Sequence, residues 1–110
     1  MVSPEYNHAP SASLKNAIDW VYPEWNRKAT TFVSYGGVCG ARAVEHLRAI
    51  AVELQLTPVQ SAIHVPVAAL YAHFQNQNVT PHLVELDAIA TTTINDLLWR
   101  TKALKTARSN

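Results

Sequence analysis

The chain has 110 residues, enough for one compact domain and too few for two. Hydrophobic residues make up 48% of it and charged residues 15%, which indicates a folded protein rather than a disordered one. Nine basic residues against eight acidic ones give a net charge of +1 without a dense basic patch, so nucleic-acid binding is not expected.

The cysteine and histidine content limits the chemistry that the chain can support. Cys39 is the only cysteine, which excludes an internal disulfide and a thiolate metal cluster. The five histidines show no HxH or HExxH spacing, and no metal site is expected. No apolar run approaches the ~20 residues needed to cross a bilayer, and residues 1–5 do not resemble a signal peptide. We therefore expect a cytoplasmic protein with no membrane partner.

The first predicted elements are the end of a strand and a helix. Residues 2–3 are interpreted as the last step of a strand, and residues 4–10 as a loop with two prolines. Ser11 or Ser13 offers a hydroxyl as N-cap of the helix, which Pro23 ends or breaks. The apolar stripe of this helix is formed by Leu14, Ala17, Ile18 and Val21.

A strand, a glycine loop and a second helix follow. Residues 30–35 are rich in β-branched and aromatic side chains and are predicted to form one buried strand. Residues 36–40 hold all three glycines of the protein. The helix after them has an apolar face of Ala43, Val44, Leu47, Ile50, Ala51 and Leu54. The charged face is expected to stay in water, with Arg42 and Arg48 near Glu45 as solvated helix pairs. A phosphate or NADPH contact by Arg42, close to the helix start, is the secondary alternative.

The last part of the chain is predicted less sharply. Residues 57–65 alternate as a half-covered or edge strand would, and residues 66–77 show no clear pattern. Residues 80–81, Thr-Pro, fit an N-cap and a first helical position, and a final helix ends at about Arg108. Because the three threonines at 91–93 weaken a helix, its continuity from Pro81 stays open.

This series of elements predicts the fold class. A strand stub, a helix, a strand, a helix, a strand and a helix indicate an α/β protein with a parallel sheet and right-handed crossovers. We expect residues 1–110 to form a single domain. A purely helical interaction module is a weaker alternative, because it leaves the two segments between strands and helices unexplained.

Two loops carry the candidate chemistry, residues 4–8 and residues 34–37. Both follow strands, so both are expected at the rim of the sheet where ligands bind in parallel-sheet proteins. The ring of Tyr6 and the amide of Asn7 suit a planar heterocycle, and the glycines let a ligand approach the backbone. Each loop also fits a simpler interpretation. The glycines could form only a tight turn, and Glu5 and Asn7 could satisfy only turn backbone groups.

These segments carry a resemblance to a known family. The chain reads PEYNH at residues 4–8, LKNAIDW at residues 14–20 and SYGG at residues 34–37. It continues with RAVEHLR at residues 42–48, and the helix around residues 98–105 also matches. In this order and spacing the motifs are similar to those of NADPH-dependent FMN reductases. The resemblance covers nearly the whole chain and is weakest over residues 66–93.

The resemblance implies a flavodoxin-like, three-layer fold that binds FMN. Hydride would pass from NADPH to the flavin and then to free flavin, a quinone, an azo dye or a metal oxyanion, and the chemistry is the cofactor's. It implies no side-chain acid or nucleophile. By resemblance Pro4, Glu5, Tyr6 and Asn7 border the isoalloxazine ring, and Ser34, Tyr35, Gly36 and Gly37 contact it from the neighbouring loop. Helix 14–20 contributes to dimer interfaces in relatives, so a homodimer or higher oligomer is expected.

The chain departs from the family pattern in two ways. Ala9 and Cys39 stand where relatives have serine, and Cys39 is interpreted as a serine replacement rather than a redox residue. Before PEYNH the family has further strands and a Gly-Ser-x-Arg phosphate loop, none of which this sequence contains. We therefore expect a truncated flavodoxin-like sheet that lacks the N-terminal strands.

That truncation would have two consequences. Each charge-assisted bond to the FMN phosphate contributes roughly 1.5–3 kcal/mol, so most FMN affinity would be lost without the phosphate loop. The strand at 30–35 would have an unpaired edge. The alternative to a working reductase is a non-catalytic remnant, stable only when it self-associates or binds a partner chain.

Overall fold

The computed structural model describes residues 1–109, and its strands form two small sheets. The larger sheet has the order β2-β1-β4-β6, formed by β1 (Val2–Tyr6), β2 (Ala9–Pro10), β4 (Val33–Tyr35) and β6 (Ile63–His64). β1, β4 and β6 run parallel, and β2 is antiparallel to β1. The smaller sheet pairs β3 (Ala29–Thr30) with β5 (Thr57–Pro58), also in parallel.

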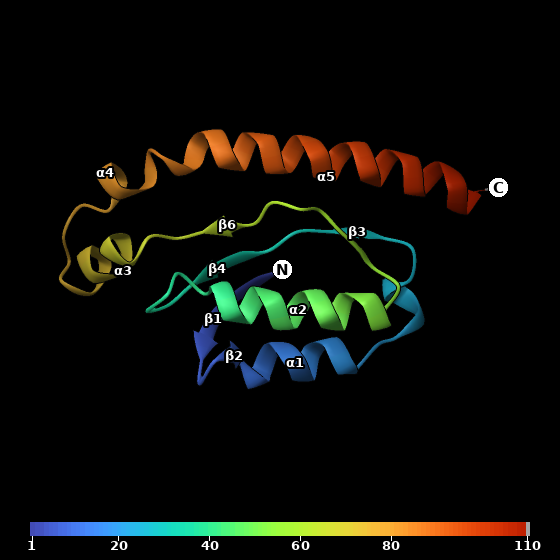
Figure 1. Cartoon of the computed structure of the whole chain (residues 1–110), viewed down its shortest axis with the longest axis horizontal. Coiled ribbons are helices and arrows are strands. Elements are labelled where there is room, and N and C mark those ends of the chain that lie inside the picture. Colours follow the sequence, from blue (N-terminus) through green and yellow to red (C-terminus); the bar gives the residue numbers. More distant parts are fainter. Residues whose placement is uncertain (110) are drawn as a thin grey trace.

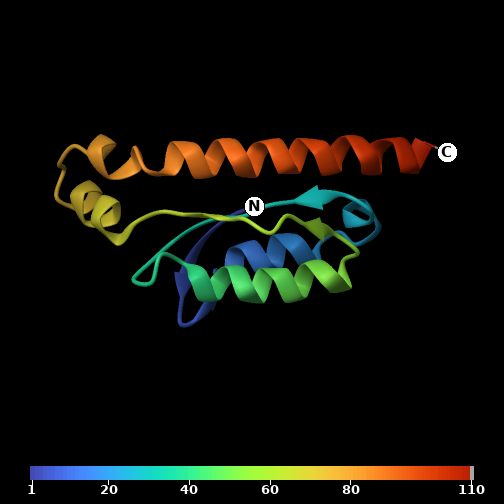
Figure 2. The same cartoon turned by 45° about the horizontal axis from the view of Figure 1, so that its top comes forward.

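Helices cover both faces of the strands, which makes three layers. α1 (Ala12–Asp19) and α2 (Ala41–Glu53) lie side by side on one face, and α5 (Leu86–Ser109) crosses the other (Figure 1, Figure 2). The 3-10 helix η1 (Pro23–Trp25) follows α1, and α3 (Val67–Phe74) and α4 (Thr80–Leu83) lie at one end of the molecule. The predicted α/β fold class with parallel strands and helix layers is confirmed.

The hydrophobic core lies between the sheet and the α1–α2 layer. From α2 the predicted stripe faces it, with Val44 and Leu47 at most 2% exposed. From α1, Ile18 is buried and Leu14 packs against the cluster. Ala17 is exposed, and Val21 lies beyond the end of α1 and is 38% exposed, so this half of the predicted α1 stripe was wrong. Ser11 caps α1 as predicted, because its hydroxyl accepts the Leu14 amide at 3.3 Å. The whole cluster is Ile18, Phe32, Val44, Leu47, Ala51, Leu54 and Leu56.

Each of the two predicted inner strands is divided into two short strands, because the pairing register between them changes part-way along. Thr30 pairs with Pro58, but Val33 pairs with Ile63, so the two residues between β3 and β4 face the four residues between β5 and β6. The surplus residues form a bulge at 59–62, which interrupts regular pairing on both strands. The prediction of single strands at 30–35 and 57–65 was therefore wrong in detail.

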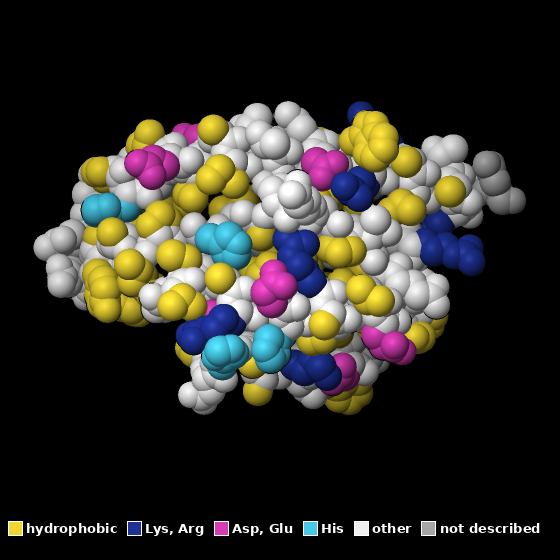
Figure 3. All heavy atoms as spheres, viewed as in Figure 1, with side chains coloured by type: hydrophobic (Ala, Val, Ile, Leu, Met, Phe, Trp, Pro, Cys, Tyr) yellow, Lys and Arg dark blue, Asp and Glu magenta, His cyan; other side chains and the backbone are white. Residues whose placement is uncertain are grey.

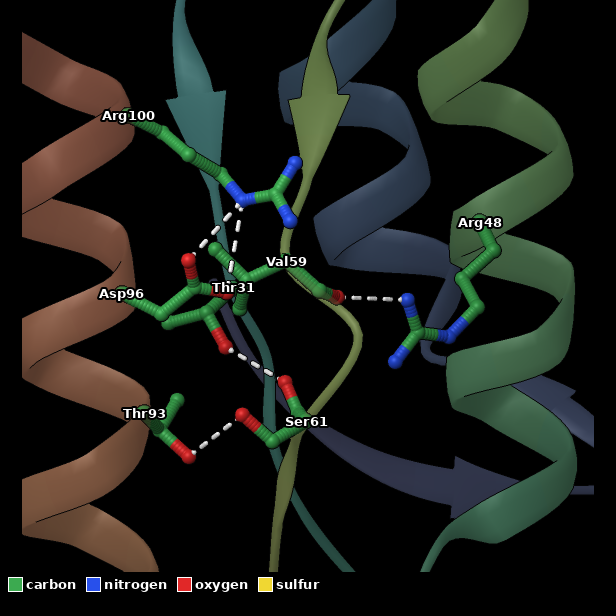
Figure 4. A network of polar contacts seen from close by, with 7 residues as sticks. All are labelled: Thr31, Arg48, Val59, Ser61, Thr93, Asp96 and Arg100. Atoms are coloured by element: carbon green, nitrogen blue, oxygen red, sulfur yellow. Dashed lines mark hydrogen bonds and ion pairs between the residues drawn. The ribbon is translucent and has the colours of Figure 1, made fainter.

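The bulge is held from both helix layers (Figure 4). From α2, the Arg48 guanidinium donates to the carbonyls of Val59 (2.8 Å) and Gln60 (2.6 Å). From α5, the hydroxyl of the fully buried Thr93 bonds to Ser61 Oγ at 2.9 Å. Side chains thus satisfy polar groups that the strand ladder leaves unpaired.

Two further predictions about strands are corrected. The strand at 30–35 was expected to have an unpaired edge. This is wrong for β4, which lies between β1 and β6 and is paired on both sides, whereas β3 pairs only with β5. Residues 4–10 were expected to form a loop, but β1 continues to Tyr6 and a hairpin joins it to β2. Pro4 is compatible with a strand because it lies where β1 has a single parallel neighbour.

The C-terminal segment resolves the questions that the sequence left open. α3 forms within the unreadable stretch at 66–77. α4 begins at Thr80 itself, and Asn78 Oδ1 accepts the Thr80 amide at 3.0 Å, so the predicted N-cap role of Thr80 was wrong. α5 runs without a break through the threonines at 91–93, although not from Pro81. No helix within residues 1–109 is long and apolar enough to span a bilayer.

Candidate functional site

The two predicted loops meet at one edge of the sheet. β1 and β4 are parallel neighbours with Pro4 opposite Tyr35, so the segments that follow them emerge together. A Cβ placed on Gly36 would lie 3.1 Å from the Cβ of Glu5, so the two segments are in direct contact. All eight predicted residues, at positions 4–7 and 34–37, therefore lie in one neighbourhood.

The segment after β1 is a tight hairpin rather than an open loop. Tyr6 pairs with Ala9, and Asn7 and His8 form the two-residue turn with φ of 49° and 73°. Positive φ at both positions is the geometry that matches the twist of paired strands, and asparagine tolerates it well. The Tyr6 side chain is 62% exposed, so the hairpin presents an accessible aromatic ring at the rim.

Glu5 does not present its carboxylate to the rim. Its side chain is 3% exposed and pairs with the guanidinium of Arg42. Its second oxygen accepts the Arg42 amide at 3.1 Å, in the first turn of α2. A carboxylate at this position satisfies an otherwise unpaired amide and complements the helix dipole. Glu5 thus fixes the hairpin to the start of α2.

The environment of Glu5 favours its ionised form. Desolvation alone would raise its pKa. The hydrogen bonds from the side chain and backbone of Arg42, the charge of Arg42 and the amide of Ala43 outweigh desolvation and hold the pKa below the ordinary 4.5.

The glycine loop is shaped by close backbone packing. Gly40 has a φ of +74°, and a Cβ there would lie 2.5 Å from the Cβ of Ser34 and 2.8 Å from the Tyr35 nitrogen. Only glycine fits this position. Gly37 differs, because nothing lies within 4 Å of its Cβ position and the residue is exposed. The loop is therefore tightly packed against β4 at Gly40, which we call its base, and is open to solvent at Gly37.

Ser34 belongs to the base of the loop, not to its open face. It is fully buried, and its hydroxyl donates to the Cys39 carbonyl at 2.8 Å. The same oxygen lies 2.8 Å from Nδ1 of His64 on β6. This network joins β4, the glycine loop and β6, and it gives Ser34 a positioning role.

One family of known proteins matches this part of the chain. The family model described as NADPH-dependent FMN reductase matches residues 1–70, which include both rim segments and α2.

The chain belongs to the NADPH-dependent FMN reductase family.

Curated relatives are similar to this chain over 49% to 63% of its length. An NAD(P)H-dependent FMN reductase of Schizosaccharomyces pombe is 39% identical over 67 residues, 59% of this chain and 34% of the relative. LOT6 of Saccharomyces cerevisiae, with the same description, is 37% identical over 63% of this chain and 37% of its own length. An NAD(P)H:quinone oxidoreductase of Solanum tuberosum is 48% identical over 49% of this chain and 30% of its own length. The matched part spans about a third of the length of these relatives.

In this chain, two arginines have contacts that the sequence did not predict. Arg42 was expected to be a solvated helix residue, but it pairs with Glu5 across 37 positions of sequence. Arg48 does lie 3.8 Å from Glu45, yet its guanidinium carbon also sits 5.5 Å from the centre of the Phe32 ring. Helix periodicity predicts a residue's own face but not a partner on a distant strand.

Cys39 and the histidines were also considered as reactive or metal-binding side chains. Cys39 is a half-buried free thiol whose φ of 57° places it in the turn before α2. Among residues 1–109, no three His, Cys, Asp or Glu side chains group in a way that could hold a metal ion. His64 was not singled out from the sequence, and its contact with Ser34 depends on a pairing between strands 30 residues apart.

Proposed function

We propose that this chain forms the ring-facing part of an NADPH-dependent FMN reductase site. The observation that carries the proposal is the contact between the Tyr6 hairpin and the Gly36–Gly37 loop at the carboxyl ends of β1 and β4. Parallel sheets bind flavin and nucleotide ligands at this edge. FMN, when bound, accepts a hydride from NADPH and passes the electrons to an acceptor.

The residues present fit an isoalloxazine ring. Gly37 leaves space where any other residue would place a Cβ, so a flat ring can approach its backbone. Tyr6 offers an exposed aromatic face, and Asn7 offers an exposed amide with donors and an acceptor. Pro4 and Tyr35 are half-buried beside them. Glu5 and Ser34 would not contact the ring through their side chains, which instead hold the hairpin and the loop in place.

The acceptor, the nicotinamide preference and the compartment belong to the proposal as well. Relatives described as FMN reductases and as quinone oxidoreductases support transfer to a flavin or quinone acceptor from NADPH or NADH. The single free cysteine agrees with a reducing cytoplasm.

Titration of the purified chain into FMN, followed by flavin fluorescence, tests the proposal. Because positions 4–7 and 34–37 contain no cationic side chain, FMN and riboflavin should bind with dissociation constants within about threefold of each other. Tyr6→Ala should weaken both by about tenfold through lost ring contact. Tyr71→Ala is the matched control, since Tyr71 is similarly exposed at 61% but lies on α3. Quenching that is absent, or equally sensitive to both variants, would contradict the proposal.

A further inference from the structure

The ring of His64 on β6 is in contact with the base of the glycine loop. Its Nδ1 lies 2.8 Å from the Ser34 hydroxyl oxygen and 3.3 Å from the Cys39 carbonyl oxygen. The Ser34 hydroxyl oxygen also lies 2.8 Å from that carbonyl. Three polar atoms from β4, the loop and β6 are thus in mutual contact, at a point where Ser34 is fully buried.

These contacts determine which ring nitrogen of His64 carries the proton. Ser34 has a single hydroxyl proton, which can satisfy only one of its two contacts. If that proton pointed at Nδ1, the Cys39 carbonyl would face two other acceptors with no donor between them. If Nδ1 carries a proton, His64 donates to Ser34 and Ser34 donates to Cys39, so every contact has a donor. A neutral His64 is therefore protonated on Nδ1, which leaves Nε2 as an acceptor.

His64 also lines a surface cavity, which can supply a donor to Nε2. The cavity has a volume of about 400 Å³ and lies between the first turns of α2 and residues 60–64. Arg42, Glu45 and Arg48 line it too, and charged and histidine side chains gather over α2 on this face of the molecule (Figure 3). Because water and guanidinium N–H groups can donate to Nε2 there, protonation on Nδ1 leaves no acceptor buried without a partner.

The backbone that His64 contacts is in an unfavourable conformation. Cys39 and Gly40 have φ values of 57° and 74°, so two successive residues lie in the left-handed region. For a residue with a side chain, such as Cys39, this region is occupied only where the surroundings fix it. The Cys39 amide donates to the Gly36 carbonyl at 3.0 Å, and the Cys39 carbonyl accepts from Ser34. The glycine loop is therefore fixed partly from β6, through the bond between His64 and Ser34.

We propose that His64 is a positioning residue of the rim, whose Nδ1–H acts through Ser34 to hold the glycine loop in its ligand-facing conformation. This step rests on the proposed function, because the glycine loop is one of the two segments assigned to the flavin ring. The role requires a hydrogen-bond donor at the position of Nδ1 and no contact between His64 and the flavin.

The protonated nitrogen can be identified in the parent chain, without a variant and without flavin. Long-range proton–nitrogen correlation spectra in alkaline buffer, where imidazoles are neutral, distinguish protonated from unprotonated ring nitrogens. We expect the proton of His64 on Nδ1, whereas His82, which is exposed on α4, should show a mixture of both forms. A proton on Nε2 of His64 would overturn the proposal.

Two substitutions separate hydrogen bonding from packing. The side-chain nitrogen of asparagine can occupy the place of Nδ1, whereas that of glutamine reaches the place of Nε2. His64→Asn should therefore keep the amide chemical shifts of Cys39 and Gly40 near those of the parent, and His64→Gln should move them. Because glutamine is closer to histidine in volume, a side chain that only filled space would give the opposite order, which would overturn the proposal. His82→Gln is the control and should leave both shifts unchanged.

FMN titration, followed by flavin fluorescence, tests the link to the rim. His64→Gln should weaken FMN binding by about fivefold, and His64→Asn should stay within about twofold of the parent. An unchanged affinity in His64→Gln, together with moved loop shifts, would overturn the positioning role. If the parent itself failed to bind FMN, the proposed function would fail, and the tautomer and the loop shifts would still confirm or overturn the hold of His64 on the loop.

Discussion

Glu5 lies in a segment that was predicted to bind a cofactor, but its side chain acts on the fold. Its carboxylate is covered, paired with Arg42 and bonded to the first turn of α2, while its backbone packs against Gly36. A neutral amide at this position would keep the shape but lose the charge that complements the guanidinium and the helix terminus. The residue thus links the geometry of the hairpin to that of the following helix.

Glu5→Gln should lower the free energy of unfolding at neutral pH by about 1 kcal/mol, as loss of a helix-capping acceptor does. Since the folded pKa of Glu5 lies below 4.5, its contribution is full above that value and disappears as pH falls through the lowered folded pKa. Urea unfolding between pH 2 and pH 7 measures this, and the variant should lose less stability than the parent on acidification.

Glu85→Gln serves as control, because Glu85 is exposed between α4 and α5. It should unfold as the parent does at every pH. If the unfolding free energies of Glu5→Gln and the parent fell in parallel as pH is lowered, the charge of Glu5 would not contribute to stability.

Gly40 and Gly37 make a matched pair in one loop. Gly40→Ala forces a side chain into positive φ and to within 3 Å of Ser34, and should cost about 3 kcal/mol of stability. Gly37→Ala meets open space and should change the unfolding free energy by less than about 0.5 kcal/mol. Thermal or urea unfolding of the two variants checks the difference, and equal effects would refute the packing of the loop base.

Among the elements, the bulge at residues 59–62 determines how the layers connect. Two residues face four at this point. The carbonyls of Val59 and Gln60 accept from Arg48 of α2, the Ser61 carbonyl accepts from the Thr31 hydroxyl, and the Ser61 hydroxyl bonds to Thr93 of α5. Thr93 is the only residue of α5 that is fully buried, and it lies on Ser61 of the bulge. The long helix is therefore positioned by a polar contact in its first third as well as by apolar packing.

Thr93→Val removes the hydroxyl bonded to Ser61 with little change in volume, and should reduce the unfolding free energy by about 1 kcal/mol. Thr92→Val makes the same substitution one position earlier, on the exposed face, and should stay within about 0.5 kcal/mol. Combining Thr93→Val with Ser61→Ala gives a double-mutant cycle. If the two single effects add fully, the contact contributes nothing.

Helix faces were predictable from sequence because periodicity records burial directly. The stripe containing Val44 and Leu47 faces the core, as do Leu14 and Ile18 of the first helix, whereas Ala17 and Val21 are exposed. The positions of the two rim loops followed from strands that end at the same edge. Strand ends were not predictable, because the division at 59–62 depends on the register between two chain segments. The partners of Arg42 and Ser34 were missed for the same reason, since each lies 30 or more positions away.

On the scale of the whole molecule, exposed aromatic surface predicts self-association. Trp20 at the end of α1 is 80% exposed and Tyr22 is 48% exposed, beside a helix that relatives are expected to use for dimers. Such a patch favours burial against a second copy. We expect sedimentation velocity to show a concentration-dependent dimer that Trp20→Ser shifts toward monomer.

Trp99→Ser is the control for this experiment, since Trp99 is 69% exposed on α5, on the other side of the sheet. It should leave the dimer unchanged. If both variants sediment alike, the dimer does not form through α1.

The direction of the backbone in β1 has a consequence for aggregation. The Met1 carbonyl accepts the Val33 amide at 2.9 Å. The peptide groups of Met1 and Ser3 therefore face the neighbouring strand β4, and those of Val2 and Pro4 face away from it. Pro4 has no amide hydrogen, and its carbonyl already accepts the Ser3 hydroxyl at 2.7 Å. Over residues 2–4 the outer side thus offers one donor, that of Val2. Cross-β stacking of unfolded or neighbouring chains therefore finds no continuous template along residues 2–4 of this edge.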